Sequence, residues 1–151
     1  MLATALARLL LDREADQMSE KVMPERQLIS IVDDDQPLRE SMSRLLRSLD
    51  YTVETFPSAA DFLASPHVDD TTCLIADVHM PLMNGDKLHR CLVDAGKSIP
   101  TILVTAYPDE ILRERVLKEG VVGYLHKPID QHGLVACICS TLTDRAPGDN
   151  S

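Results

Sequence analysis

The stretch ISIVDDDQPLRE, residues 29–40, decides the fold class of this chain. An apolar, β-branched run ends at three consecutive aspartates, and Pro37 then opens an amphipathic segment with helical spacing. Adjacent carboxylates repel one another unless a cation or a helix N-terminus offsets their charge. The stretch therefore predicts a buried strand that ends at an anionic site and is followed by a helix.

The same order of strand and helix repeats along the chain. We expect strands at 28–32, 51–56, 72–77, 101–105 and 122–126, and helices over 37–49, 58–65, 86–96, 109–120 and 131–142. Strand–helix alternation predicts right-handed crossovers, and hence a parallel sheet with helices on both faces. In such sheets a ligand binds beyond the carboxyl ends of the strands.

Polar side chains occupy those expected strand ends. They are Asp33, Asp34 and Asp35 after the first strand, Asp77 on the third, Thr105 on the fourth and Lys127 after the fifth. Carboxylate oxygens without a cluster of Cys or His suit a hard cation such as Mg²⁺. An ammonium and a hydroxyl beside that cation suit a phosphoryl group, and a carboxylate can then act as the nucleophile.

Composition limits the classes of function. The chain has 151 residues and a net charge of −9, which argues against a nucleic-acid surface. No apolar run approaches the roughly 20 residues of a membrane span. The cysteines have neither metal-site nor secreted-framework spacing, so we expect reduced core cysteines in a cytoplasmic protein. They are Cys73, Cys91, Cys137 and Cys139.

Residues 1–26 are expected to be an N-terminal extension, residues 27–142 one domain, and residues 143–151 a disordered tail. Apolar residues at positions 2, 6, 9 and 10 have helical spacing, and Arg8 interrupts them, unlike a signal peptide. Two interpretations stay open. The extension is a short amphipathic helix that docks on a surface, or a dispensable leader, since Met18 and Met23 offer later starts.

Four motifs carry a resemblance over about residues 27–142. They are IVDDD after the first strand, ADVHMPLMNG around Asp77, LVTAY around Thr105, and GYLHKP ending at Lys127-Pro128. Asp34 and Asp77 are 43 positions apart, and Thr105 and Lys127 are 22 apart. Together the motifs resemble the response-regulator receiver domains of two-component signalling, and VDDD, TAYPDE and GVVGYLHKP are most similar to FixJ-like receivers.

The resemblance implies a doubly wound (βα)5 flavodoxin-like three-layer sandwich, with a parallel five-stranded sheet in the order 2-1-3-4-5. It implies that Asp77 is the phosphate acceptor, and that Lys127 and Thr105 contact the phosphoryl group. Mg²⁺, for which Mn²⁺ is expected to substitute, would have the ligands Asp33, Asp34, Asp77 and the backbone carbonyl of His79. The domain would be a signalling switch rather than an enzyme acting on other molecules.

Further roles follow from the same resemblance. Thr105 and Tyr124 would form the switch, and the peptide bond before Pro128 would be cis. The side chains of His79 and Tyr107 would flank the path of the hydrolytic water and set the lifetime of the phosphorylated state.

The implied partners are proteins. A histidine kinase or phosphotransfer protein would donate the phosphoryl group. An effector protein or a second receiver would bind the face built from residues 109–119, 122–126 and 131–142. Because the sequence is acidic and only about nine residues follow position 142, we expect no direct contact with nucleic acid, and none with a membrane.

Two other functions are alternatives to the signalling switch. Asp33-x-Asp35 ends a first strand as in haloacid-dehalogenase-like phosphatases, but Pro37 stands where those enzymes place Thr or Val, and no cap domain is expected. The second alternative is a scaffold protein that no longer needs phosphate. The full set of site residues argues against this alternative.

Several side chains have simpler local roles. Asp35 is expected to cap the next helix, and Asn84-Gly85 to form a plain turn. The side chains of His79, His89 and His126 are expected to be solvated, because a hard-cation site does not favour imidazole.

Overall fold

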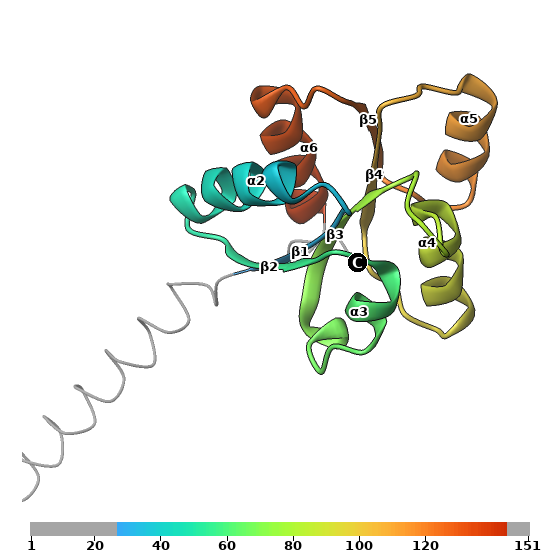
Figure 1. The fold of residues 1–151 in the computed structure, drawn as a ribbon, viewed down its shortest axis with the longest axis horizontal. Coiled ribbons are helices and arrows are strands. Elements are labelled where there is room, and N and C mark those ends of the chain that lie inside the picture. Colours follow the sequence, from blue (N-terminus) through green and yellow to red (C-terminus); the bar gives the residue numbers. More distant parts are fainter. Residues whose placement is uncertain (1–26, 145–151) are drawn as a thin grey trace, which may run out of the picture.

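A parallel sheet organises residues 27–144, the part of the chain that the computed structural model describes (Figure 1). Its strands are β1 (Leu28–Val32), β2 (Thr52–Phe56), β3 (Thr71–Asp77), β4 (Thr101–Thr105) and β5 (Gly123–His126). They are hydrogen-bonded in the order β2-β1-β3-β4-β5, and every neighbouring pair is parallel. The flavodoxin-like fold and strand order expected from the sequence are therefore confirmed.

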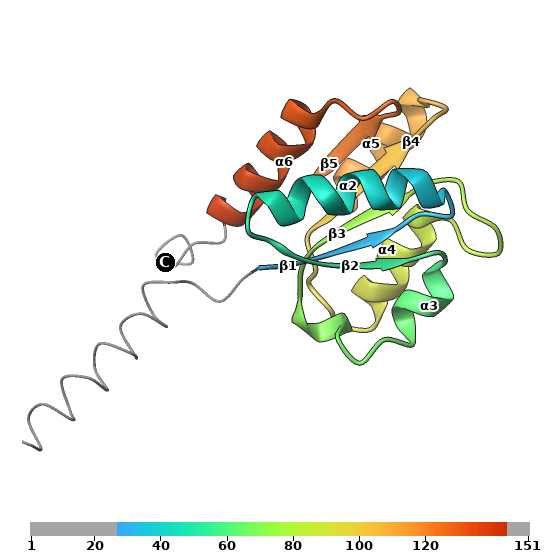
Figure 2. The ribbon, with the colours of Figure 1, turned by 60° about the vertical axis from the view of Figure 1, so that its left-hand side comes forward.

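Helices cover both faces of the sheet. They are α2 (Gln36–Ser48), α3 (Ala59–Leu63), α4 (Gly85–Asp94), α5 (Glu110–Lys118) and α6 (Gln131–Asp144). Helices α2 and α6 lie on one face, whereas α3, α4 and α5 lie on the other (Figures 1 and 2). The residues expected to form the N-terminal extension, and those of the expected tail from 145 onward, lie outside the described residues.

Two apolar clusters fill the space between the layers. One joins α2 and α6 to the sheet through residues such as Leu46, Ile102 and Ile138. The other joins α3, α4 and α5 to the opposite face through residues such as Phe62 and Leu103. All five residues of β1 and of β4 are buried, as expected for strands covered on both faces.

Local signals set the helix ends. Asp35 caps α2 by accepting a hydrogen bond from the Leu38 amide, and Pro37 lies in the first turn, both as expected. Ser58 caps α3 through the Asp61 amide. Gly120, with φ +105°, follows the end of α5 in a left-handed conformation that favours glycine.

The differences from expectation are small. Helix α6 continues to Asp144, two residues beyond its expected end, and a 3₁₀ turn at Val68–Asp70 was not expected, because so short a turn has no periodicity to reveal it. All four cysteines are free, but only Cys73 is buried, and Cys137 is half-buried. Cys91 and Cys139 are exposed, so their assignment to the core is wrong.

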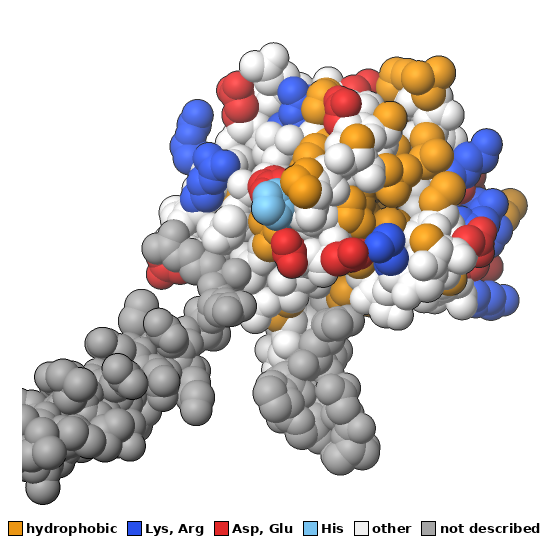
Figure 3. Space-filling view, turned by 90° about the horizontal axis from the view of Figure 1, so that it is seen from below, with side chains coloured by type: hydrophobic (Ala, Val, Ile, Leu, Met, Phe, Trp, Pro, Cys, Tyr) orange, Lys and Arg blue, Asp and Glu red, His pale blue; other side chains and the backbone are white. Residues whose placement is uncertain are grey.

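The surface is mixed in character. Figure 3 shows hydrophobic side chains gathered across one face, with acidic and basic side chains around them. No helix among residues 27–144 is long and apolar enough to cross a membrane.

Candidate functional site

Three carboxylates meet at the carboxyl edge of the sheet. Strands β1 and β3 are neighbours, so Asp33 and Asp34, which follow β1, lie beside Asp77 at the end of β3. Each of the three offers an oxygen, and these oxygens lie within 4.8 Å of one another. Asp34 is exposed, whereas Asp33 and Asp77 are buried.

Asp33 is the most strongly perturbed acid of this cluster. It is 1% exposed, and burial raises the pKa of its carboxyl to about 6. The hydrogen bond that Oδ1 accepts from the Asp35 amide (2.9 Å) opposes this shift, while the charge of Asp77 adds to it. The fold therefore places Asp33 where its negative charge is costly.

Lys127 supplies a positive charge between the two buried acids. Its Nζ lies 3.0 Å from Oδ2 of Asp33 and 3.2 Å from Oδ2 of Asp77. Burial alone would lower the pKa of Lys127, but the contacts with the two carboxylates outweigh burial and raise it. The backbone holds the lysine in place, because its amide donates to the Thr105 carbonyl (2.8 Å) and the Lys127–Pro128 bond is cis.

The cluster fits a hard divalent cation. Its donors are carboxylate oxygens, the ligands that Mg²⁺ prefers. Oδ2 of Asp33 is buried and has no hydrogen-bond partner among the described residues; its contact with Lys127 is an ion pair without hydrogen-bond alignment. A buried oxygen with free lone pairs beside two further carboxylates is what a metal ligand requires.

Gly85 lies close against strand β3, a contact that the sequence did not reveal. A Cβ at this position would overlap the carbonyl oxygen of Asp77 and press against Leu103. The Gly85 amide donates to the Val78 carbonyl (3.0 Å), and α4 starts at this residue. Asn84-Gly85 therefore forms a turn and also brings the start of α4 into close contact with β3. In the sequence, the only sign of this contact was a glycine at the first position of a helix.

Two hydroxyls hold the loop that joins β4 to α5. Thr105 is fully buried, and its Oγ1 accepts a hydrogen bond from the Tyr107 amide (2.9 Å). Tyr124 is half-buried on the neighbouring strand β5, and its hydroxyl accepts from the Asp109 amide (3.2 Å). Both expected switch residues therefore contact the backbone of one loop.

His79 and Tyr107 come together near Asp77. Their rings make an edge-to-face contact with centroids 5.4 Å apart, and both side chains are exposed. The His79 amide donates to Oδ1 of Asp77 (3.2 Å). His126 is also exposed, as expected.

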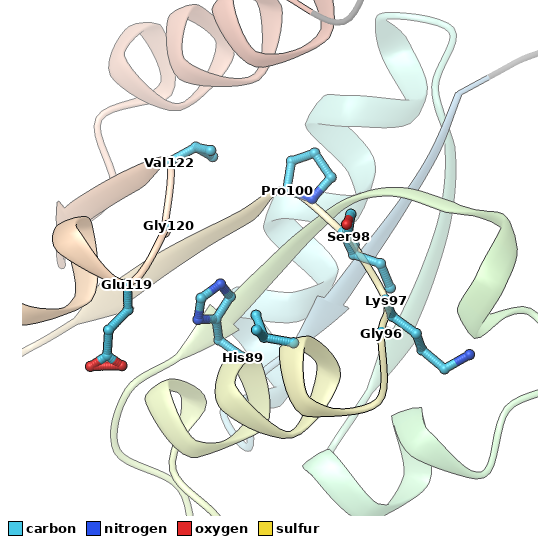
Figure 4. A pocket seen from close by; sticks show the side chains of 10 residues that line it. His89, Gly96, Lys97, Ser98, Pro100, Glu119, Gly120 and Val122 are labelled. Carbon is cyan, nitrogen blue, oxygen red and sulfur yellow. The ribbon is translucent and has the colours of Figure 1, made fainter.

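The expectation that His89 is solvated is wrong. The residue is 5% exposed, and burial lowers its pKa. It belongs to the buried stripe of α4, formed by Gly85, Leu88, His89 and Leu92, whose helical spacing is visible in the sequence. It lines an open cavity of about 340 Å³ that also involves Val122 and Glu119 (Figure 4). This cavity lies at the amino ends of β4 and β5, away from the acidic cluster.

Comparisons with known proteins agree with this geometry. Residues 29–139 match the response regulator receiver domain family. The response regulator protein TodT of Pseudomonas putida is 36% identical over 115 residues, which cover 76% of this chain and 51% of TodT. The transcriptional regulatory protein FixJ of Azorhizobium caulinodans is 33% identical over 120 residues, 80% of this chain and 57% of FixJ. The chain thus spans about half the length of the curated relatives it matches.

A solved structure has the same fold as this chain. The crystal structure of FixJ-N superimposes with a TM-score of 0.69 and 30% sequence identity, covering 78% of this chain and 94% of that one.

The contact of Gly85 with the acceptor strand predicts a large effect of a small change. Gly85→Ala should lower the free energy of unfolding by about 1–3 kcal/mol, because the new methyl group has to displace backbone rather than a flexible side chain. Urea denaturation measures the loss. Gly133→Ala is the matched control, since its nearest neighbour is the movable carboxylate of Asp130 (3.3 Å), and a comparable loss there would contradict the argument.

Because Asp33 is buried, replacing it with a neutral residue should stabilise the folded protein, by an amount that depends on pH. The folded pKa of about 6 lies above the ordinary 3.8, so the wild type loses stability as the pH rises from about 4 to 6. In chelator, Asp33→Asn should therefore be more stable than wild type by about 1–3 kcal/mol at pH 7.5, with the gain fading by pH 4. Urea denaturation at both pH values tests this. The exposed Asp34→Asn serves as the control, and an equal gain there would argue against a burial effect.

Proposed function

This chain belongs to the response regulator receiver domain family, and we propose that it accepts a phosphoryl group on Asp77 from a histidine kinase or phosphotransfer protein. The observation that carries the proposal is the position of the Lys127 ammonium, which contacts both Asp77 and Asp33 at the edge of the sheet. One lysine beside two buried carboxylates leaves the site able to take up a cation and, next to it, an anionic group.

Asp77 is the nucleophile in this proposal. A bond forms between a carboxylate oxygen of Asp77 and phosphorus while the bond from phosphorus to the donor's histidine nitrogen breaks. That nitrogen takes the electron pair, and the donor ring, protonated on its other nitrogen, leaves as neutral imidazole. Lys127 holds one oxygen of the phosphoryl group, and the His79 amide keeps the carboxylate oriented. Asp33, Asp34, Asp77 and the His79 carbonyl would hold Mg²⁺, which offsets the charge of the phosphoryl oxygens.

The signal then leaves through the loop between β4 and α5. The Thr105 hydroxyl turns from the Tyr107 amide to the new phosphoryl oxygen, and Tyr124 turns into the space that Thr105 vacates. This removes the Tyr124 hydroxyl from the Asp109 amide at the start of α5. The face of α5, β5 and α6 changes shape, and an effector or a second receiver binds the altered face more tightly.

The effector is either a separate protein or a domain joined to the receiver. FixJ is by name a transcriptional regulatory protein, and this chain spans about half of such relatives. The same face serves both arrangements. The comparisons give no support to the haloacid-dehalogenase alternative, and the phosphate-independent scaffold is separated from our proposal by the next experiment.

Phosphorylation should occur on Asp77 alone and require the acidic cluster. Incubation with acetyl phosphate and Mg²⁺, followed by peptide mapping, should place the group on Asp77. Asp77→Asn should take up none, and Asp34→Ala should lose both uptake and Mg²⁺ binding. Label on another residue, or full uptake in excess chelator, would refute the mechanism; no uptake by folded wild type would favour the scaffold.

The ring pair of His79 and Tyr107 should control the lifetime of the phosphorylated state. Removing either ring opens a path for water to Asp77, so His79→Ala and Tyr107→Ala should lose phosphate faster, by roughly two- to tenfold. Mg²⁺ affinity should change less, because only the backbone of His79 would reach the ion. Phosphate release is followed over time, with the exposed His132→Ala as control. Wild-type rates in both ring variants would count against this role.

A further inference from the structure

Helix α5 is weakly packed compared with its neighbour α4. Val116 is the one buried residue of α5. Helix α4 buries Gly85, Leu88, His89 and Leu92 along one stripe. Since buried apolar surface normally supplies most of the stability of a helix in a protein, the position of α5 depends unusually on its polar contacts.

One of these polar contacts joins α5 to α4. Nη2 of Arg115 lies 2.9 Å from Oδ2 of Asp86, and Nη1 lies 2.8 Å from Oε1 of Glu119. The other oxygen of Glu119 lies 3.6 Å from Nε of Arg90 on α4. Figure 4 shows Glu119 just after the end of α5, with its side chain extended toward α4. The guanidinium of Arg115 thus spans the gap between the two helices.

The α4 side of this bridge is fixed. The side chain of Asp86 is 12% exposed, against 43% for Arg115. Asp86 follows Gly85, whose backbone lies against the Asp77 carbonyl and bonds to Val78. The bridge therefore runs from a helix packed against the phosphate acceptor to the helix that carries the output face.

We propose that Arg115 is a positioning residue, whose contacts with Asp86 clamp α5 in its resting position and oppose the switch. The inference rests on the proposed function, because it concerns the equilibrium that phosphorylation of Asp77 shifts. In the resting state Tyr124 restrains the start of α5, while Arg115 in its second half and Glu119 just after its end contact α4. When Tyr124 turns inward the first restraint is lost, and further movement of α5 requires the contact of Arg115 with Asp86 to break.

The bridge differs from an ordinary surface ion pair. Isolated exposed pairs contribute little, but here one guanidinium bonds to two carboxylates, one of them partly buried, and such a network is a more favourable case. The hydrogen bond that Arg115 donates to Asp86 is the largest cause of the raised pKa of Arg115. Its loss on switching makes the clamp a differential interaction, which is what shifts a two-state equilibrium.

Beryllofluoride with Mg²⁺, an analogue of the phosphoryl group, gives the test. The protein is titrated with beryllofluoride, and NMR follows the amide signals of the β4–α5 loop and of α5. The midpoint is the concentration at which half of the signal change has occurred. Arg115→Ala and the isosteric Asp86→Asn should each lower the midpoint by roughly three- to tenfold. Their combination should lower it no further than Arg115→Ala alone, because Asp86→Asn removes the charge that the same contact requires. The exchanged pair Asp86→Arg/Arg115→Asp should move the midpoint back toward wild type.

Arg113→Ala is the matched control. Arg113 pairs with Glu110 within α5 (3.1 Å), at 44% exposure, and so resembles Arg115 in charge and exposure without bridging the helices. The beryllofluoride midpoint of Arg113→Ala should equal that of wild type. An unchanged or raised midpoint in Arg115→Ala and Asp86→Asn, or an equal shift in Arg113→Ala, would overturn the clamp.

Failure of the proposed function has a different signature. If folded wild type does not respond to beryllofluoride at all, the phosphoryl site is wrong. The clamp is then judged on ligand-free spectra, where displaced α5 amides in Arg115→Ala support it and unchanged ones refute it. Should Arg115→Ala fail to fold, Asp86→Asn carries the same comparison.

Discussion

Two buried carboxylates share one lysine, and the rest of the site depends on that arrangement. Asp33 and Asp77 are 1% and 5% exposed, and Lys127 contacts both. Burying charge is costly unless it is paired, and here two acids have one ammonium between them. The parallel pairing of β1 with β3 keeps the acids together, and the hydrogen bond between the Lys127 amide and the Thr105 carbonyl keeps the lysine over them. The excess negative charge is the feature of the site that fits a cation.

The same edge of the sheet joins Asp77 to the surface proposed as the output face. Thr105 and Tyr124 lie on adjacent strands, and each hydroxyl accepts a hydrogen bond from an amide of the loop that leads into α5. A hydroxyl that changed partner would release a backbone amide, so in the proposed switch a change at Asp77 would reach α5 through contacts that are each about 3 Å long. This route would need no deformation of the core.

The sequence predicted those features that depend on local pattern. Apolar runs predicted the strands, Asp35 before Pro37 predicted a capped helix, and the order of four motifs predicted which side chains meet. It did not reveal the close approach of Gly85 to Asp77, or the pairing of Arg115 with Asp86, 29 positions away. Such contacts depend on how two helices pack on the sheet, and no local pattern encodes that distance. The burial of His89 is different, because the helical spacing along α4 places it on the buried face with Leu88 and Leu92.

The unequal packing of α4 and α5 sets which helix a phosphoryl group can move. A hydrogen bond to a charged group contributes about 1.5–3 kcal/mol to stability. Full burial of one aliphatic side chain contributes about the same amount. In the proposed switch, the new bond to Thr105 would therefore be comparable with the loosening of a helix that fully buries Val116 and only partly buries Leu112. It would not offset the displacement of α4, which would expose Leu88, His89 and Leu92 together. On this proposal α4 stays with β3, and α5 is the element whose position a single hydrogen bond would be strong enough to change.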